Sequence, residues 1–387
     1  MIDEQASIRA IGLKAGERVN IQSELVDGMG EHWTAQADFV ADAEGNIDTA
    51  KQPALAGSYR EISTMGLIWS MMPASRKTGR YQVPRDIQPI EFRLMRGKMQ
   101  VASAHLEQIP IAEGVQRVRV HEGALRGTLF LPAGKDRHPG VLTLGGSEGG
   151  QPSLRAAWLA SHGYAALALA YFRFDDLPRE LAGIPLEYFG QALNWMAQRP
   201  EIASDHIAVM GVSRGAELAL QLGSMYKDIK AVVAYAPSNV RNPACCGSTS
   251  VPYAWTWSGN ALAFRSLRPG AGQPDARATI EVERTAGPIL LLSGQDDRVW
   301  DSSSMADSIV SRLKRANFPY PVEHLKYPHA GHESGRPQIV PAWEGLVRNP
   351  TSGREMDLGG TPKGNAESSL DAIPKTLDFL RQSLSTH

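Results

Sequence analysis

The fold is decided by the stretch His206-Ile207-Ala208-Val209-Met210-Gly211-Val212-Ser213-Arg214-Gly215. An apolar strand ending at Met210 runs into the motif Gly-x-Ser-x-Gly, and a helix is expected to begin near Ala216. In such a setting the serine lies on a sharp strand-to-helix turn, where flanking glycines relieve crowding of the backbone. The motif alone also fits an ordinary glycine-bounded turn. The strand before it and the helix after it favour Ser213 as a nucleophile.

The sequence on both sides of this stretch predicts a parallel sheet. Helical stretches such as Leu186–Gln198 separate short, continuous apolar runs. These runs occupy residues 141–144, 165–170, 206–210, 230–235 and 288–293. Apolar strands that alternate with helices are typical of a parallel sheet buried on both faces. Together with the serine turn, this pattern predicts an α/β-hydrolase catalytic domain over residues 121–387.

The first part of the chain has a different pattern. Short segments mix β-forming residues with polar ones at residues 18–21, 33–40 and 91–95, and turn signals separate them. Short strands with regular breaks are typical of an antiparallel sandwich or barrel. We therefore predict an N-terminal all-β, sandwich-like domain over residues 1–120. A hairpin made by residues 117–120 and 127–131 is expected to lead into the catalytic domain.

A catalytic serine needs a base, and the base is usually an imidazole oriented by a carboxylate. In the predicted fold the acid follows the serine in sequence and the histidine comes last. Asp297 stands shortly after the apolar run 288–293, where the carboxyl edge of the sheet would present it. It is preferred to its neighbours Asp296 and Asp301, which could instead be turn or capping residues.

The histidine is expected in the turn-rich segment Tyr327-Pro328-His329-Ala330-Gly331-His332-Glu333. His332 follows the acid and has a glycine directly before it, an arrangement common in this fold. A loop position would let its imidazole reach the carboxyl edge of the sheet. His329 is the alternative. The predicted triad is therefore Ser213, Asp297 and His332.

Acyl transfer also needs donors for a developing oxyanion, usually two backbone N–H groups. Arg214 would supply the first because it follows the nucleophile. The loop Gly145-Gly146-Ser147-Glu148-Gly149-Gly150 would supply the second, with Ser147 as our choice. A phosphate-binding loop is disfavoured because the Gly-Lys-Ser/Thr ending is missing. We expect neither a metal nor a cofactor, because no His-Glu-x-x-His or Cys-x-x-Cys pattern is present.

Residues 236–285 form a long insertion between two expected strands. The insertion is predicted to be a lid or a pocket wall, although a surface excursion without a catalytic role is an equal alternative. It contains the two cysteines, Cys245 and Cys246, and adjacent cysteines have an unfavourable geometry for a mutual disulfide.

Charge and hydropathy exclude several classes of partner. The chain has 40 basic and 41 acidic residues, so no electrostatic footprint for nucleic acid or an anionic membrane is expected. No apolar run reaches the roughly 18 residues that a membrane span needs, and the first residues lack the pattern of a signal peptide. A cytoplasmic location is the expectation. The oligomeric state stays open because no heptad pattern is visible.

Longer motifs resemble the family of acyl-CoA thioesterases and bile acid-CoA:amino acid N-acyltransferases. They run in the right order over nearly the whole chain. In the N-terminal part they are residues 56–59 and 65–73, and in the catalytic part they are residues 162–164, 168–172, 186–189 and 358–362, besides the Ser, Asp and His segments. The resemblance implies attack on an acyl-CoA thioester, an acyl-enzyme at Ser213 and release of CoA, with CoA as part of the substrate.

Members of that family that pass the acyl group to glycine or taurine carry cysteine at the nucleophile position, so Ser213 favours hydrolysis. The same machinery would also serve an acyltransferase or a carboxylic ester or lactone hydrolase. A binding protein on a hydrolase fold, without catalysis, is the alternative from another class. The expected substrate is a small-molecule acyl thioester or ester.

Overall fold

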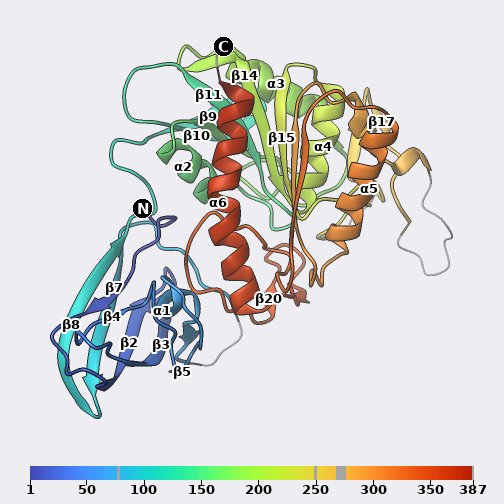
Figure 1. Ribbon diagram of the computed structural model, residues 1–387. Coiled ribbons are helices and arrows are strands. Elements are labelled where there is room, and N and C mark those ends of the chain that lie inside the picture. Colours follow the sequence, from blue (N-terminus) through green and yellow to red (C-terminus); the bar gives the residue numbers. More distant parts are fainter. Residues whose placement is uncertain (76–78, 248–250, 267–275, 386–387) are drawn as a thin grey trace.

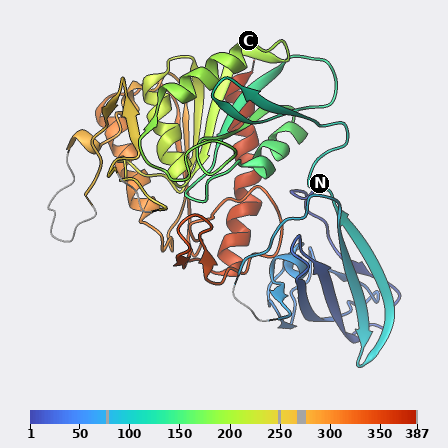
Figure 2. The ribbon, with the colours of Figure 1, turned by 180° about the vertical axis from the view of Figure 1, so that it is seen from behind.

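The computed structural model of the chain describes residues 1–75, 79–247, 251–266 and 276–385. These residues form an N-terminal β domain and a larger domain built on a second sheet (Figure 1). Both views show the β domain below the large sheet, beside the first turns of the long C-terminal helix α6 (Pro362–Leu384) (Figures 1 and 2).

The N-terminal domain contains a six-stranded antiparallel sheet of order β5-β3-β2-β7-β8, in which β6 also pairs with β3. The strands are β2 (Arg18–Val26), β3 (His32–Val40), β5 (Ala56–Gly57), β6 (Met72–Pro73), β7 (Gln88–Arg96) and β8 (Met99–Gln108). A second, two-stranded sheet joins β1 (Arg9–Ala10) to β4 (Ile47–Asp48). The short helix α1 (Gly66–Trp69) is completely buried.

Strand β3 shows why these residues form a one-sided sheet. Its side chains alternate between exposed and buried positions, and the buried ones are Trp33, Ala35, Ala37 and Phe39. Because successive side chains of a strand point to opposite faces, this alternation places one apolar face on a core.

The larger domain is built on an eight-stranded sheet of order β19-β18-β15-β14-β11-β12-β10-β9. The six strands from β19 to β12 run parallel, whereas β10 pairs antiparallel with both β12 and β9. The strands are β9 (Gln116–Glu122), β10 (Leu125–Leu131), β11 (His138–Leu144), β12 (Ala165–Ala170), β14 (Ile202–Val212), β15 (Ile229–Tyr235), β18 (Ile289–Gly294) and β19 (Val322–Tyr327).

Helices cover both faces of this sheet. Helix α2 (Ser153–Ser161) and helix α6 share one apolar core with one face of the strands. The opposite face packs on α3 (Glu187–Ala197), α4 (Arg214–Met225) and α5 (Ser302–Arg315). Burial on both faces explains why the central strands are apolar without alternation, as in the fully buried β12.

Smaller elements lie outside the two large sheets. Strands β13 (Ile184–Pro185), β16 (Trp255–Trp257) and β17 (Asn260–Ala261) form a three-stranded sheet. Two short 3₁₀ helices, η1 (Ala276–Ala278) and η2 (Val282–Arg284), precede β18. A two-stranded hairpin joins β20 (Val347–Arg348) to β21 (Glu355–Met356).

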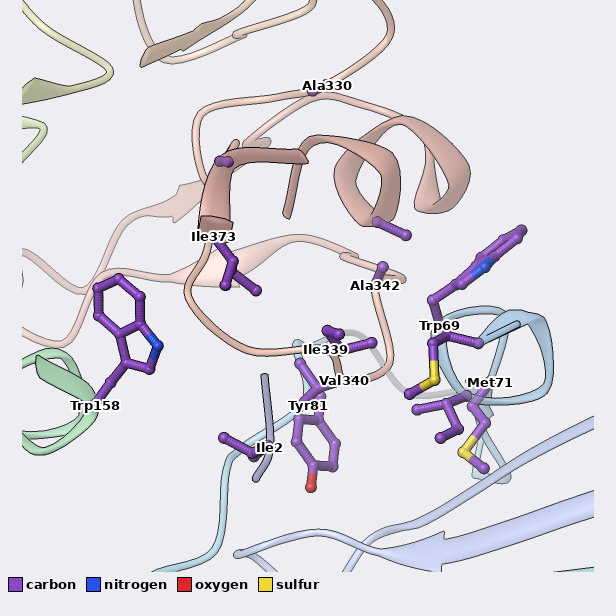
Figure 3. Packing of buried hydrophobic residues seen from close by; sticks show 14 of the residues in the cluster. Ile2, Trp69, Met71, Tyr81, Trp158, Ala330, Ile339, Val340, Ala342 and Ile373 are labelled. Carbon is purple, nitrogen blue, oxygen red and sulfur yellow. The ribbon is translucent and has the colours of Figure 1, made fainter. Parts of the chain in front are cut away.

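The two domains share a core at their junction. Figure 3 shows the segment with Ile339, Val340 and Ala342 lying between Ile2 and Trp69, while Ile373 of α6 closes the cluster from the other side. Backbone bonds reinforce the contact, because the Ile339 N–H donates to Ile2 O (2.9 Å) and the Ala342 N–H donates to Trp69 O (2.9 Å). The junction is therefore packed as a protein interior, not as a loose linker.

The predicted fold class is confirmed: an antiparallel β domain precedes a mostly parallel sheet covered by helices. Strand β9 already belongs to the large sheet from Gln116 onward, so the boundary expected at residue 120 lies within this strand. Across the described ranges, none of the helices combines the length and the apolar character that a membrane crossing needs.

Candidate active site

Ser213 lies on the sharp turn between β14 and α4. Its backbone has φ of 56° and ψ of −120°, and its N–H donates to Tyr235 O of the neighbouring strand (2.9 Å). A positive φ is unfavourable for a residue with a side chain and survives only where the surroundings enforce it. The turn presents the hydroxyl at the carboxyl edge of the sheet, as the sequence motif predicts.

The flanking glycines are required by close approach of the backbone. A Cβ at Gly211 would collide with the carbonyl of Gly215, and one at Gly215 would collide with the carbonyls of Leu144 and Gly145. The turn is thus pressed against the end of β11. This packing explains why the motif has glycine at both of these positions.

His332 accepts a hydrogen bond from the Ser213 hydroxyl. Its Nε2 lies 2.8 Å from Ser213 Oγ, and its Nδ1 lies 2.8 and 3.0 Å from the two carboxylate oxygens of Asp297. A carboxylate can only accept, so Nδ1 carries the proton and Nε2 offers a lone pair to the serine hydroxyl. His332 is 5% exposed, and the Trp300 ring packs edge-on against the imidazole. The arrangement can perform general base catalysis on a serine.

Asp297 is itself held by several donors. Its Oδ2 accepts from the Ser302 hydroxyl (2.6 Å), and its Oδ1 accepts from the N–H groups of Val299 (2.9 Å) and Trp300 (3.2 Å). These bonds aim the carboxylate at the imidazole and leave it 1% exposed.

The alternative residues point elsewhere. The Asp296 carboxylate pairs with Arg298 and accepts from the Gly360 N–H, and Asp301 caps helix α5 by accepting from the Ser304 N–H. His329 is exposed, with a positive φ of 59°. The structure therefore brings together Ser213, Asp297 and His332, and leaves the other candidates outside the hydrogen-bonded relay.

The pKa of His332 is raised above its ordinary value. Burial of the ring acts to lower it, but the hydrogen bond and the charge of Asp297 outweigh burial, and Glu333 and Glu148 add to the rise. A base with a raised pKa accepts the serine proton more readily, at the cost of being protonated over a wider range of acidic pH.

The two predicted oxyanion donors lie next to the nucleophile. Arg214 is the first residue of α4, a position whose N–H has no acceptor within its own helix. Ser147 lines the same cavity as Ser213, and its hydroxyl accepts from the Asn349 side chain (3.0 Å). The neighbouring Gly146 N–H donates to Glu148 Oε1 (3.0 Å) and is therefore occupied. Ser147 and Arg214 stay the predicted donors.

Two adjoining cavities open at Ser213. One, of about 350 Å³, has His332 in its wall together with Arg80 and Gln82 of the N-terminal domain and Arg348 of β20. The other, of about 550 Å³, is lined by residues 242–246 of the long insertion and by Trp300. Both domains and the insertion thus contribute to the walls around the nucleophile.

The insertion is anchored to helix α4 directly behind the nucleophile. Glu217 of α4, which is fully buried, accepts from Asn242 Nδ2 (2.7 Å) and from Trp255 Nε1 (2.8 Å). The Arg214 side chain donates to the carbonyls of Asn242 and Pro243. These bonds place the described part of the insertion as a pocket wall, which was one of the two expectations for it.

The expectation for the two cysteines was wrong. Cys245 and Cys246 are joined by a disulfide, with their Cα atoms 3.7 Å apart. Cys246 has a positive φ of 74°, a backbone conformation that residue type alone does not predict. Both cysteines line the larger cavity.

Several site residues carry no signal that the sequence analysis used. Trp300 and Ser302 lie close to Asp297 in sequence, and their proximity was a usable hint. Glu333 directly follows His332, but a charged residue beside a histidine is too common to single out. Arg80 reaches the site from another domain, and no local pattern could have placed it there.

The chain matches known proteins in both of its domains. Residues 3–122 match the profile described as "Acyl-CoA thioester hydrolase/BAAT N-terminal region", and residues 184–386 match "BAAT / Acyl-CoA thioester hydrolase C terminal". The chain is similar to Acyl-coenzyme A thioesterase 6 of Mus musculus, with 34% identity over 99% of this chain and 94% of the mouse protein. Mitochondrial Acyl-coenzyme A thioesterase 2 of the same species is 34% identical over 99% of this chain and 87% of its own length.

Among solved structures, a dienelactone hydrolase-like promiscuous phosphotriesterase from metagenomic libraries covers 70% of this chain and 98% of its own. The TM-score is 0.45 at 16% identity.

Proposed function

Because this chain belongs to the acyl-CoA thioester hydrolase/BAAT family, we propose that it hydrolyses acyl-CoA thioesters through an acyl-enzyme at Ser213. The resemblance expected from the long motifs is confirmed by these matches. Family membership supports an acyl-CoA thioester as the group that Ser213 attacks. The hydrogen-bonded relay from Ser213 through His332 to Asp297 is the observation that supports the catalytic mechanism.

In the proposed mechanism, Ser213 Oγ attacks the thioester carbonyl while its proton moves to His332 Nε2. The N–H groups of Arg214 and Ser147 would stabilise the resulting oxyanion. Collapse of the tetrahedral intermediate breaks the carbon–sulfur bond, and the imidazolium returns the proton to the leaving thiolate. The Asp297 carboxylate accepts the hydrogen bond from His332 Nδ1 and stabilises the imidazolium.

Deacylation repeats these steps with water. His332 takes a proton from a water molecule, the hydroxide adds to the acyl-enzyme carbonyl, and the Ser213 alkoxide leaves with the proton from His332. The products are a free carboxylic acid and CoA with its thiol. Serine at the nucleophile position supports water as acceptor, because the family resemblance associates the transfer to amino acids with cysteine there.

The test is an assay of purified protein on acyl-CoAs of graded chain length, with and without glycine or taurine. We expect release of free thiol with a carboxylic acid as the acylated product, and loss of at least 10³-fold in Ser213→Ala. An N-acyl amino acid product would make the protein a transferase. Turnover of aryl esters without thiol release would contradict the proposal.

The alternative acceptor chemistry has no structural observation in its favour. The cytoplasmic location also stays a prediction, since the named relatives include a mitochondrial protein. Family membership supports an acyl-CoA as the substrate, and the assay with acyl-CoAs of graded length determines the preferred acyl chain.

A further inference from the structure

We propose that Arg80 of the N-terminal domain is a positioning residue for catalysis, which balances the two carboxylates Glu333 and Glu148 beside the imidazole of His332. The inference rests on the proposed role of His332 as the base. It assigns the β domain a direct part in the chemistry of the active site.

The first observation is a chain of ion pairs that crosses the domain junction. Arg80 Nη1 donates to Glu333 Oε1 (2.9 Å), and the other oxygen of Glu333 lies 3.5 Å from Arg336 Nη2. Arg336 in turn donates to Glu344 Oε1 (2.6 Å). Glu344 is 5% exposed and Arg336 is 14% exposed, whereas Arg80 and Glu333 are 31% and 26% exposed, so water screens the Arg80 end of this network more than the Arg336 end.

The second observation is the fixed position of Arg80. Its backbone pairs with Glu344 in an antiparallel bridge, and the Gly345 N–H donates to Gly79 O (3.1 Å). The next residue, Tyr81, is buried at the domain junction beside Ile339 and Val340 (Figure 3). A strand-like backbone contact therefore holds Arg80 at the wall of the active-site cavity.

The third observation is the crowding of negative charge around His332. Glu333 follows the histidine directly, Glu148 comes from the loop after β11, and Asp297 comes from the loop after β18. Glu148 and Glu333 line one cavity with His332 and Arg80. Arg80 interacts with both of these carboxylates, and Arg336 lies beside Glu333 and Glu344. A further cation, Arg348, lines the same cavity.

The charges act on the imidazole in opposite directions. Burial acts to raise the pKa of Glu333, but Arg80 and Arg336 outweigh it and hold that pKa well below its usual value, so Glu333 is ionised. Burial raises the pKa of Glu148, and Arg80 opposes the rise. Glu333 and Glu148 both favour the imidazolium, and Arg80 is a counter-charge to both carboxylates.

Removal of either charge should shift the pKa of His332, in opposite directions for Arg80 and Glu333. Without Arg80 the negative charge of Glu333 and Glu148 is no longer offset, so the pKa of His332 rises. The imidazole then becomes protonated at a higher pH. Without the charge of Glu333 the pKa of His332 falls, and the neutral form persists to lower pH. A residue that only supports the fold would change rates or stability, but it would not produce shifts of opposite sign.

The experiment measures the second-order rate of Ser213 labelling by a fluorophosphonate between pH 5 and 9. This reaction needs the base but not a CoA substrate. We expect the acid limb to move up by about half a pH unit in Arg80→Met and down by a similar amount in Glu333→Gln, roughly threefold in rate at a fixed pH on the limb. The double variant should lie between the two, and Arg80→Lys should restore the wild-type limb.

The matched control is Arg18→Met, which removes an exposed cation of the same domain that pairs with Asp38 on the surface of the sheet. Its acid limb should coincide with that of wild type. Should Arg80→Met fail to fold, Arg80→Gln is measured in its place, and an acid limb that stays in place or moves down overturns the proposal.

Other outcomes separate the two proposals. Wild-type protein that is not labelled at Ser213 would overturn the triad itself. Normal labelling with limbs that do not move, or that move in the same direction in both variants, would overturn only the role of Arg80. An increased KM for acyl-CoA in Arg80→Met with an unmoved limb would likewise overturn it, and would indicate a contact with the substrate.

Discussion

Two adjacent carboxylates, Asp296 and Asp297, show how single side chains are assigned different tasks at the residue scale. Asp296 pairs with exposed Arg298. The Asp297 side chain is buried and accepts a hydrogen bond from the imidazole of His332. The difference arises in the turn after β18, where Asp296 accepts from the Gly360 N–H and Asp297 accepts from the N–H groups of the two residues Val299 and Trp300. The chemistry of the two groups is the same, and only their surroundings separate them.

This contrast makes a prediction at the residue scale. Asp297→Asn should keep the fold but lose about 10³- to 10⁴-fold in kcat, because an amide no longer holds the His332 tautomer that accepts the serine proton. The measurement is steady-state thiol release at saturating acyl-CoA, with circular dichroism to check folding. Asp296→Asn is the matched control and should keep kcat within about threefold of wild type. Equal losses in the two variants would contradict the assignment.

At the scale of elements, helix α4 links the nucleophile to the wall of the substrate cavity. Its first turn supplies the predicted oxyanion donor, and its buried Glu217 binds Asn242 and Trp255 of the insertion. The Arg214 guanidinium lies 3.4 Å from Glu217 and is also buried. Helix α4 therefore begins at the catalytic turn and binds the insertion through its buried side chains.

Removal of the Glu217 charge tests this link. Glu217→Gln should lower the free energy of unfolding by about 3 kcal/mol, because the buried Arg214 guanidinium would lose its counter-charge. Urea denaturation followed by tryptophan fluorescence measures the change. The control is Glu281→Gln, which removes an exposed partner of Arg284 and should cost less than about 0.5 kcal/mol. A loss as small as that of the control would show that the buried charge of Glu217 does not stabilise α4 and its surroundings.

At the scale of the whole molecule, the two domains share one apolar core. Ile339 is 3% exposed at the junction; its N–H donates to Ile2 O and its carbonyl accepts from Gln108 Nε2. The segment that carries Ile339 begins only a few residues after His332. One stretch of chain therefore contributes to both the junction and the active site, and its residue Glu333 pairs with Arg80 of the β domain.

The shared core predicts cooperative unfolding. Ile339→Ala should destabilise the protein by about 3 kcal/mol and shift a single transition that includes both domains, because the cavity lies in their common core. Fluorescence and far-UV circular dichroism should report coincident curves in urea. Ile11→Ala, at a position 79% exposed, is the control and should leave the midpoint nearly unchanged. Two separate transitions, only one of them shifted, would show that the domains unfold independently.

The sequence by itself determined the features that depend on local pattern. The apolar runs and the glycine-flanked Ser213 predicted the sheet and the turn, because strand burial and backbone crowding leave their mark within a few residues. The order of acid and histidine along the chain then selected Asp297 and His332, which the structure brings to Ser213. Their catalytic roles remain predictions until the variants are assayed.

Only the tertiary structure decided how distant charges and side chains meet. Arg80 and Glu333 are 253 residues apart in sequence, and the packing of the domain junction alone brings them together. Cys245 and Cys246 are joined by a disulfide, and Cys246 has a positive φ that residue type does not reveal. Local periodicity reports the burial of a single element, whereas electrostatic balance around an imidazole depends on elements from every part of the chain.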